Sequence, residues 1–191
     1  MKSTALATAF AALTAGAAFA DGHLQAYTLD PAHSAIQMSW GHGQFSSTYG
    51  MFFEVNGEMM IDFDNPENTT VSISVPLEDL VVDPTLKGHL ASDNFFGGYD
   101  GKMVQFTSTS VTVTGEDRAE VTGDLTIAGT TSEVTIDTVF NARGAGPTGG
   151  EIAGFTGTAT ILRSDFGIDW FAPFVSDEVA VEVSIEASPA S

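Results

Sequence analysis

Apolar and polar residues alternate along most of the chain with a period of two. Val121, Leu125 and Ile127 share one face of an extended segment, while the threonines between them share the other. This alternation is typical of an antiparallel strand with one dry and one wet face. It predicts ten strand segments separated by turn-forming residues, at 27–30, 34–40, 45–50, 52–63, 69–77, 103–114, 119–127, 133–142, 152–162 and 178–187.

One stretch departs from the alternation. Asp83 and Pro84 stand before Leu86, Leu90 and Phe95 at spacings that suit a helix begun by proline in its first turn. We therefore expect an all-β fold, a single closed antiparallel barrel of about eight main strands, with one short lid helix near residues 84–96. A two-sheet sandwich remains the alternative, because periodicity alone cannot show that a sheet closes.

The apolar faces of these segments identify the side chains that would line the interior of such a barrel. Small residues such as Gly57, Gly123, Gly157 and Ala159 fall on the same faces, which indicates either a ligand cavity or relief of strain at bends. The candidate pore-lining residues are Ile36, Met38, Trp40, Phe53, Val55, Met59, Ile61, Val71, Ile73, Leu90, Phe95, Phe106, Val121, Leu125, Ile136, Phe140, Phe155 and Ile161.

The first twenty residues hold Lys2, an uncharged Ala-rich run and a small-residue ending at Ala20, which predicts a secretory signal peptide over 1–20. A retained membrane anchor is the weaker alternative, because the run is short and dominated by alanine. The remainder, 21–191, then forms one domain in an exported, periplasmic protein. It contains no cysteine, so its stability depends on its core.

Charge and motifs exclude several classes of function. The chain has 25 acidic and six basic residues and a formal net charge of −19, which repels nucleic acid and anionic lipid surfaces. It lacks the nucleophile elbow, the phosphate loop and the dinucleotide fingerprint, and no histidine pair has a zinc-binding spacing. We therefore expect no catalytic residues, no metal and no cofactor other than a bound lipid.

Four side chains are candidates for the barrel rim, where they would meet a ligand headgroup: His33, His42, His89 and Arg163. Isolated histidines more often hydrogen-bond turns. Arg163 is followed closely by Asp165, which favours an ion pair that braces a turn over contact with a headgroup.

An ordered set of short motifs over nearly all of the chain after residue 20 resembles the YceI family of secreted lipid-binding proteins. The residues that carry the resemblance are Tyr27, Asp30, Pro31, His33 and Ser34; His42; His89, Leu90, Ser92, Phe95 and Phe96; Phe106, Ser108 and Thr109; Gly123, Leu125, Thr126, Ile127, Gly129, Thr130 and Thr131; Gly154 and Phe155; and Arg163 to Ile168.

The resemblance implies a lipocalin-like barrel with a lid helix, whose pore holds a polyisoprenoid, an isoprenoid quinone or a similar long amphiphile. It also implies a possible homodimer and a possible membrane-protein partner of the cytochrome b561-like type. Two alternatives remain: a small periplasmic enzyme that uses a metal or His33, His42 or His89, and an interaction module whose barrel is filled by its own side chains.

Overall fold

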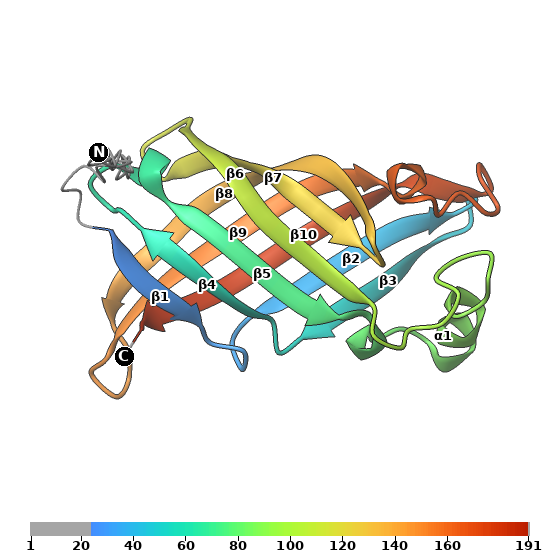
Figure 1. Cartoon of the computed structure of the whole chain (residues 1–191), viewed down its shortest axis with the longest axis horizontal. Helices are drawn as coiled ribbons and strands as arrows, with labels where there is room; N and C mark the ends of the chain where they lie inside the picture. The colour runs from blue at the N-terminus through green and yellow to red at the C-terminus, as the bar shows by residue number, and fades with distance from the viewer. Residues whose placement is uncertain (1–23, 191) are drawn as a thin grey trace, which may run out of the picture.

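A computed structural model describes residues 24–190, and the predicted signal peptide lies outside this range. The described chain is an antiparallel β structure (Figure 1). Its strands are β1 (Gln25–Leu29), β2 (Ala35–His42), β3 (Ser46–Phe53), β4 (Asn56–Ile61), β5 (Thr70–Pro76), β6 (Met103–Val113), β7 (Arg118–Ile127), β8 (Thr130–Ala145), β9 (Glu151–Leu162) and β10 (Val175–Pro189). The short helices are η1 (Pro66–Asn68), η2 (Leu77–Asp79), α1 (Pro84–Leu90) and η3 (Arg163–Phe166).

The sheet closes on itself through β10. Its order is β1-β4-β5-β6-β7-β8-β9-β10-β2-β3, and an additional β1–β10 pairing makes a ring of eight strands. One edge of β10 pairs with β9, and its other edge pairs with β2 and then with β1. The predicted closed barrel is therefore confirmed, with the β2–β3 hairpin prolonging the wall at one end (Figure 1).

Alternation explains how each strand faces the interior. On β7, Val121 is buried and Leu125 is partly buried, whereas Thr122 and Thr126 point outward. The hydroxyls of these threonines lie 2.9 Å and 2.7 Å from those of Thr135 and Thr131 on β8. Such cross-strand pairs stabilise the wet face, while the dry face is left to line the interior.

The structure corrects the predicted single strand over 52–63. Strand β3 ends at Phe53, and the next residue, Glu54, adopts a left-handed φ of 55° before β4 begins. An interruption of this kind reverses which residues of the strand face inward. Phe52 is consequently buried at 2% exposure and Phe53 is 49% exposed, so the prediction that Phe53 lines the pore is wrong.

The lid forms where the sequence predicts it but is shorter. Asp83 caps α1 by accepting hydrogen bonds from the backbone N–H groups of Thr85 and Leu86, and Pro84 occupies the first turn. The helix ends at Leu90, and residues 91–102 continue as turns. Within residues 24–190, no helix has the length and apolar character needed to cross a membrane.

The lid segment covers one end of the barrel (Figure 1). Phe95 and Phe96 pack against both the large core cluster that contains Leu90 and the cluster of Ile161 and Phe166 beside η3. The Tyr99 hydroxyl donates to the Lys87 carbonyl at 2.7 Å, and the Lys102 ammonium donates to the Phe96 carbonyl. Apolar contacts thus hold the lid on the wall, and the hydrogen bonds fasten the turns after α1 to one another and to the helix.

Two of the predicted small residues mark close approach of backbones. A Cβ atom on Gly57 would lie 2.3 Å from the Ser72 carbonyl oxygen, and one on Gly123 would lie 2.4 Å from that of Thr107. Gly123 also stands opposite the irregularity between Ser108 and Ser110 on β6. Close approach of the neighbouring strand therefore accounts for Gly57 and Gly123, whereas Gly157 and Ala159 line a cavity.

Gly123→Ala should lower the free energy of unfolding by about 1–3 kcal/mol, because the new methyl group must displace the backbone of β6. Gly144→Ala on β8 is the matched control, because a Cβ there meets nothing within 4 Å. Urea titration of both variants measures the difference. Equal stability of the two would show that the β6–β7 contact is not tight.

Candidate functional site

A cavity of about 410 Å³ runs inside the barrel. Its wall comes from β2 to β10 and from the segments next to β4 and β5, and its side chains are overwhelmingly apolar. The volume lies within the range of small-molecule sites in proteins, roughly 300–1,000 Å³. The alternative of a barrel filled by its own side chains is therefore wrong.

Most of the side chains that the sequence assigned to the pore line this cavity. They are Ile36, Met38, Met59, Ile61, Val71, Ile73, Phe106, Val121, Leu125, Ile136, Phe140, Phe155 and Ile161. They come from seven strands, β2 and β4 to β9, and meet because alternation and closure bring their faces to one interior. Their role as ligand contacts remains a prediction.

Four other predicted pore residues lie outside the cavity lining. Leu90 and Phe95 belong to the lid, and Trp40 packs in the cluster beside η3. Val55 is fully buried in the main core, next to the break between β3 and β4. These side chains pack around the cavity, and periodicity cannot separate that role from contact with its interior.

The cavity opens between the β6–β7 turn and η1, at the end opposite the lid (Figure 1). Exposed residues of the turn, Glu116, Asp117 and Arg118, belong to its lining, as do Pro66 and Thr69. The Arg118 Nε atom lies 3.9 Å from Asp117 Oδ1, so the one cationic side chain of this turn has an anionic neighbour. We call this opening the mouth.

Asp62 is fully buried where the wall meets the mouth. Its carboxylate accepts hydrogen bonds from the Asn68 amide at 3.0 Å and from the backbone N–H groups of Asp64 and Asn65 at 3.0 Å and 2.9 Å. The bonds from Asn68 and Asn65 hold the pKa of the Asp62 carboxyl below its usual range. This carboxylate therefore fixes the turn that carries η1 while adding negative charge beside the mouth.

Sequence reasoning missed several lining residues, and each omission has a local cause. Phe52 was assigned to the wrong face because of the break after Phe53. Val111 and Val113 follow the irregularity on β6 that changes which residues point inward. The mouth residues Thr69 and Arg118 gave no periodic signal, because they lie at or beside turns.

All four rim candidates lie away from the cavity lining. The His42 ring stacks edge-on against Phe174 at 5.0 Å, and His89 lies on α1. His33 Nδ1 lies 2.8 Å from Asp30 Oδ2, and this contact raises the pKa of His33 and lowers that of Asp30. These four side chains therefore do not line the cavity, and their contact with a ligand headgroup remains a prediction.

Arg163 braces a loop, as the sequence favoured, but through backbone carbonyls. It is 7% exposed, its Nε donates to Ser176 O at 2.8 Å, and its terminal nitrogens donate to Ile168, Trp170 and Val175 at 2.6–3.0 Å. Asp165 is not among these partners. One guanidinium thus satisfies four carbonyls that the loop from η3 to β10 would otherwise leave without donors.

Asp30, His33 and Glu186 are the described residues that could hold a metal ion, since their ligand atoms lie within 4.8 Å of one another. Two contacts already occupy the Asp30 carboxylate: the His33 ring, and the Ala32 N–H at 2.9 Å in a local turn. Ser34, next in sequence, exchanges hydrogen bonds with the Glu186 backbone. The cluster thereby ties the β1–β2 junction to β10.

A second polar cluster supports the wall near the mouth. The Tyr27 hydroxyl donates to Glu151, whose other oxygen lies 3.0 Å from Arg143 Nε. The Arg143 guanidinium lies 4.2 Å above the ring of Phe63, which lines the cavity. Burial and the bond to Glu151 raise the pKa of Tyr27 to about 12, while bonds from Tyr27 and Arg143 lower the pKa of Glu151.

Comparison with known proteins identifies the relatives of this barrel. The YceI-like domain matches residues 27–187, from the middle of β1 almost to the end of β10. The chain belongs to the YceI family. A UPF0312 protein of Pseudomonas savastanoi pv. phaseolicola is 33% identical over 185 residues, which cover 95% of this chain and 94% of that protein. A UPF0312 protein of Pseudomonas putida is 36% identical over 167 residues, covering 86% and 85%.

Solved structures share the YceI barrel. BcnA of Burkholderia cenocepacia superposes with a TM-score of 0.74 at 21% identity, covering 84% of this chain and 99% of that one. A YCEI protein of Campylobacter jejuni gives 0.68 at 25% identity, covering 79% and 90%. A polyisoprenoid binding domain from Saccharophagus degradans gives 0.62 at 13% identity, covering 88% and 100%.

The link between Tyr27, Glu151 and Arg143 predicts a pH-dependent stability of this YceI barrel. Because the pKa of Glu151 is lowered in the folded state, its stabilisation is complete above the ordinary glutamate pKa of ~4.3. It is lost as pH falls through the lowered value. Glu151→Gln should therefore unfold more easily than wild type at pH 7, and the difference should shrink toward pH 3.

Thermal unfolding across this pH range measures the effect. Glu133→Gln, an exposed position on β8, controls for the general loss of one acidic charge. A difference between Glu151→Gln and wild type that stays constant from pH 7 to pH 3 would contradict the proposed role of the carboxylate.

Proposed function

We propose that this protein is a binding protein, not an enzyme, and that it carries a long isoprenoid lipid in the cavity. The observation that carries the proposal is the continuous apolar lining of a closed barrel that leaves about 410 Å³ unfilled. Apolar cavities hold water poorly and take up apolar molecules. The fold neighbour described as a polyisoprenoid binding domain supports the isoprenoid class.

The energetics favour capture of a long tail. Burial of several hundred Å² of apolar surface, at about 25 cal/mol per Å², contributes on the order of ten kcal/mol before association costs. Met38, Met59, Phe106 and Phe155 place flexible thioethers and flat rings along the lining. These side chains adapt readily to a bent hydrocarbon chain.

The mouth favours a ligand with an uncharged head. Glu116, Asp117 and the buried Asp62 outnumber Arg118 there, and the chain as a whole carries a net charge of −19. The negative charge at the mouth would repel a phosphate or carboxylate head, whereas it would not repel an uncharged quinone or alcohol head. We therefore propose a polyprenyl quinone or polyprenol as the ligand class.

The proposed setting is the periplasm, on the strength of the signal-like residues 1–20. There, a lipid with a buried tail could move through water between membranes. A homodimer and a cytochrome b561-like partner remain predictions of the family resemblance.

Filling the cavity should abolish lipid uptake. Ala159→Phe adds a ring inside the lining, and Thr158→Phe adds the same ring to the exposed face of the same strand. Organic extraction of gently purified protein, followed by mass spectrometry, should recover an isoprenoid from wild type and Thr158→Phe but not from Ala159→Phe. Circular dichroism confirms that each variant is folded.

Two results would overturn the carrier proposal. One is repeated wild-type preparations that yield no lipid and, after delipidation, take up neither isoprenoid quinones nor fatty-acid derivatives. The other is equal lipid content in Ala159→Phe and wild type.

Head selectivity is tested by competition. Delipidated protein should prefer a polyprenol to the polyprenyl phosphate of equal length, and the preference should weaken at 0.5 M salt. The double variant Glu116→Lys, Asp117→Lys should reduce or reverse it, because the mouth becomes positive. A preference for the phosphate in wild type would contradict the uncharged-head assignment while leaving the carrier proposal intact.

A further inference from the structure

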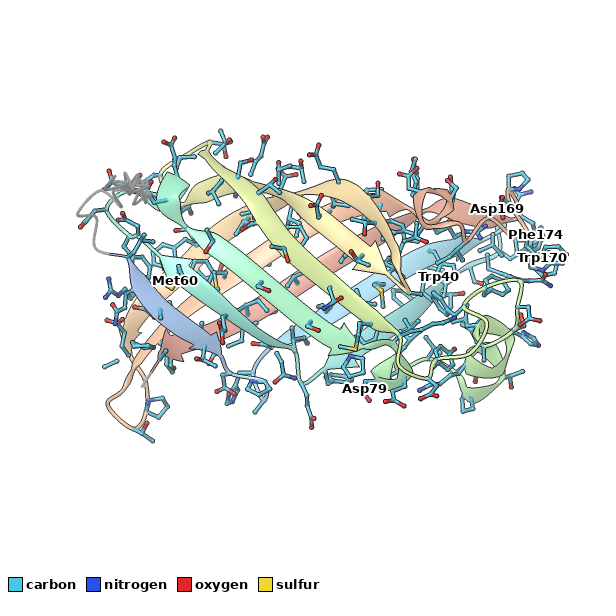
Figure 2. All side chains as sticks on the ribbon, in the orientation of Figure 1. Trp40, Met60, Asp79, Asp169, Trp170 and Phe174 are labelled. Carbon is cyan, nitrogen blue, oxygen red and sulfur yellow. The ribbon has the colours of Figure 1, made fainter. Side chains whose placement is uncertain are left out.

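Four large aromatic side chains are exposed together at the lid end of the molecule. Phe45 is 77% exposed in the turn after β2, and Trp170, Phe171 and Phe174 are 45%, 59% and 48% exposed in the loop before β10. Figure 2 shows Trp170 and Phe174 at the extremity of the long axis, beyond the barrel wall. We call these four residues the aromatic tip; none of them lines the cavity.

The two loops of the tip are fastened to each other. The Gly43 N–H donates to the Phe174 carbonyl at 2.6 Å, and the Phe174 ring lies 6.4 Å from that of Phe45. The Trp170 and Phe171 rings contact each other at 5.2 Å. Beneath them, Arg163 binds the Trp170 and Val175 carbonyls. The rings are therefore presented outward by an ordered base.

Phe171 occupies a costly backbone conformation. Its φ is 64°, a left-handed region that bulky L-residues rarely adopt and that glycine adopts freely. The strain is not repaid by burial, because the side chain is 59% exposed. Strain of this kind concentrates where a side chain serves a binding function.

We propose that the aromatic tip docks the protein on a lipid bilayer surface by shallow insertion of its rings. Trp and Phe side chains favour the membrane interface, and a projecting loop can insert them without a wide flat contact. The exposed parts of the four rings offer roughly 450 Å². A stable protein–protein interface needs about 800 Å² per partner, so a second protein is the poorer fit.

Charge selects the kind of bilayer. The two loops contain no lysine, their one arginine is the buried Arg163, and Asp165 and Asp169 are exposed beside the rings. Attraction to anionic headgroups therefore cannot drive the contact. The tip should bind uncharged or zwitterionic lipid through its apolar rings, and anionic lipid should weaken binding at low salt.

The test is flotation of the full protein with phosphatidylcholine vesicles, alone or with 30% phosphatidylglycerol. Wild type should float with the zwitterionic vesicles at 0.1 M and 0.5 M salt, and less with the anionic vesicles at low salt. Phe45→Ser and Phe171→Gly should each reduce partitioning roughly tenfold, since each removes one inserted ring. Phe171→Gly should not lower the melting temperature, because glycine relieves the backbone strain.

Phe53→Ser is the matched control, since Phe53 is also an exposed phenylalanine, at 49%, but lies on the outer face of β3 away from the tip. Absence of vesicle binding by wild type would overturn the proposal, as would equal loss in Phe53→Ser. So would a solution dimer, measured by light scattering, that the tip variants dissociate. Lipid content of the tip variants should match wild type, so this outcome is separate from that of the carrier proposal.

Discussion

Completion of the hydrogen-bonded ladder around β10 is the constraint on which the interior depends. The strand spans Val175–Pro189, long enough to pair with β9 along one edge and with β2 and β1 in turn along the other. Closure satisfies backbone donors and acceptors without filling the centre with side chains. The wall can therefore remain ordered around empty apolar volume, which a sandwich of two packed sheets does not permit.

Packing that a solid core would supply is distributed around the cavity. One cluster joins β1, β4, η2 and the lid through Tyr27, Met59, Leu77 and Leu90. A second gathers beside η3, and a third surrounds Phe106 and Val121. Two buried polar side chains fix turns and loops at the ends of the barrel. Asp62 fixes the turn at η1, and Arg163 holds the loop before β10. The two ends of the barrel therefore differ in chemistry. One end has the acidic mouth, and the other has the lid and the aromatic tip.

The alternation of the sequence predicted much of the fold and most of the cavity wall. Val121, Leu125, Ile136 and Ile161 were placed correctly because each lies within an uninterrupted strand, where the period of two fixes the face. Asp83 and Pro84 marked the start of the lid, because capping is a local interaction. Phe53 was placed wrongly and Val111 was missed, because a strand break or irregularity shifts the alternation by one residue and neighbouring residues do not signal it.

The sequence by itself determined that this chain is an antiparallel, acidic, cysteine-free β protein with a continuous apolar face, because these properties depend on composition and on neighbours along the chain. Tertiary structure alone decided that Arg163 and the three described histidines, His33, His42 and His89, lie outside the cavity lining, that Glu116 to Arg118 border its mouth, and that Phe45 meets Phe174. These contacts join residues from separate strands and turns, and their distances are set only when the barrel closes with a particular register and tilt.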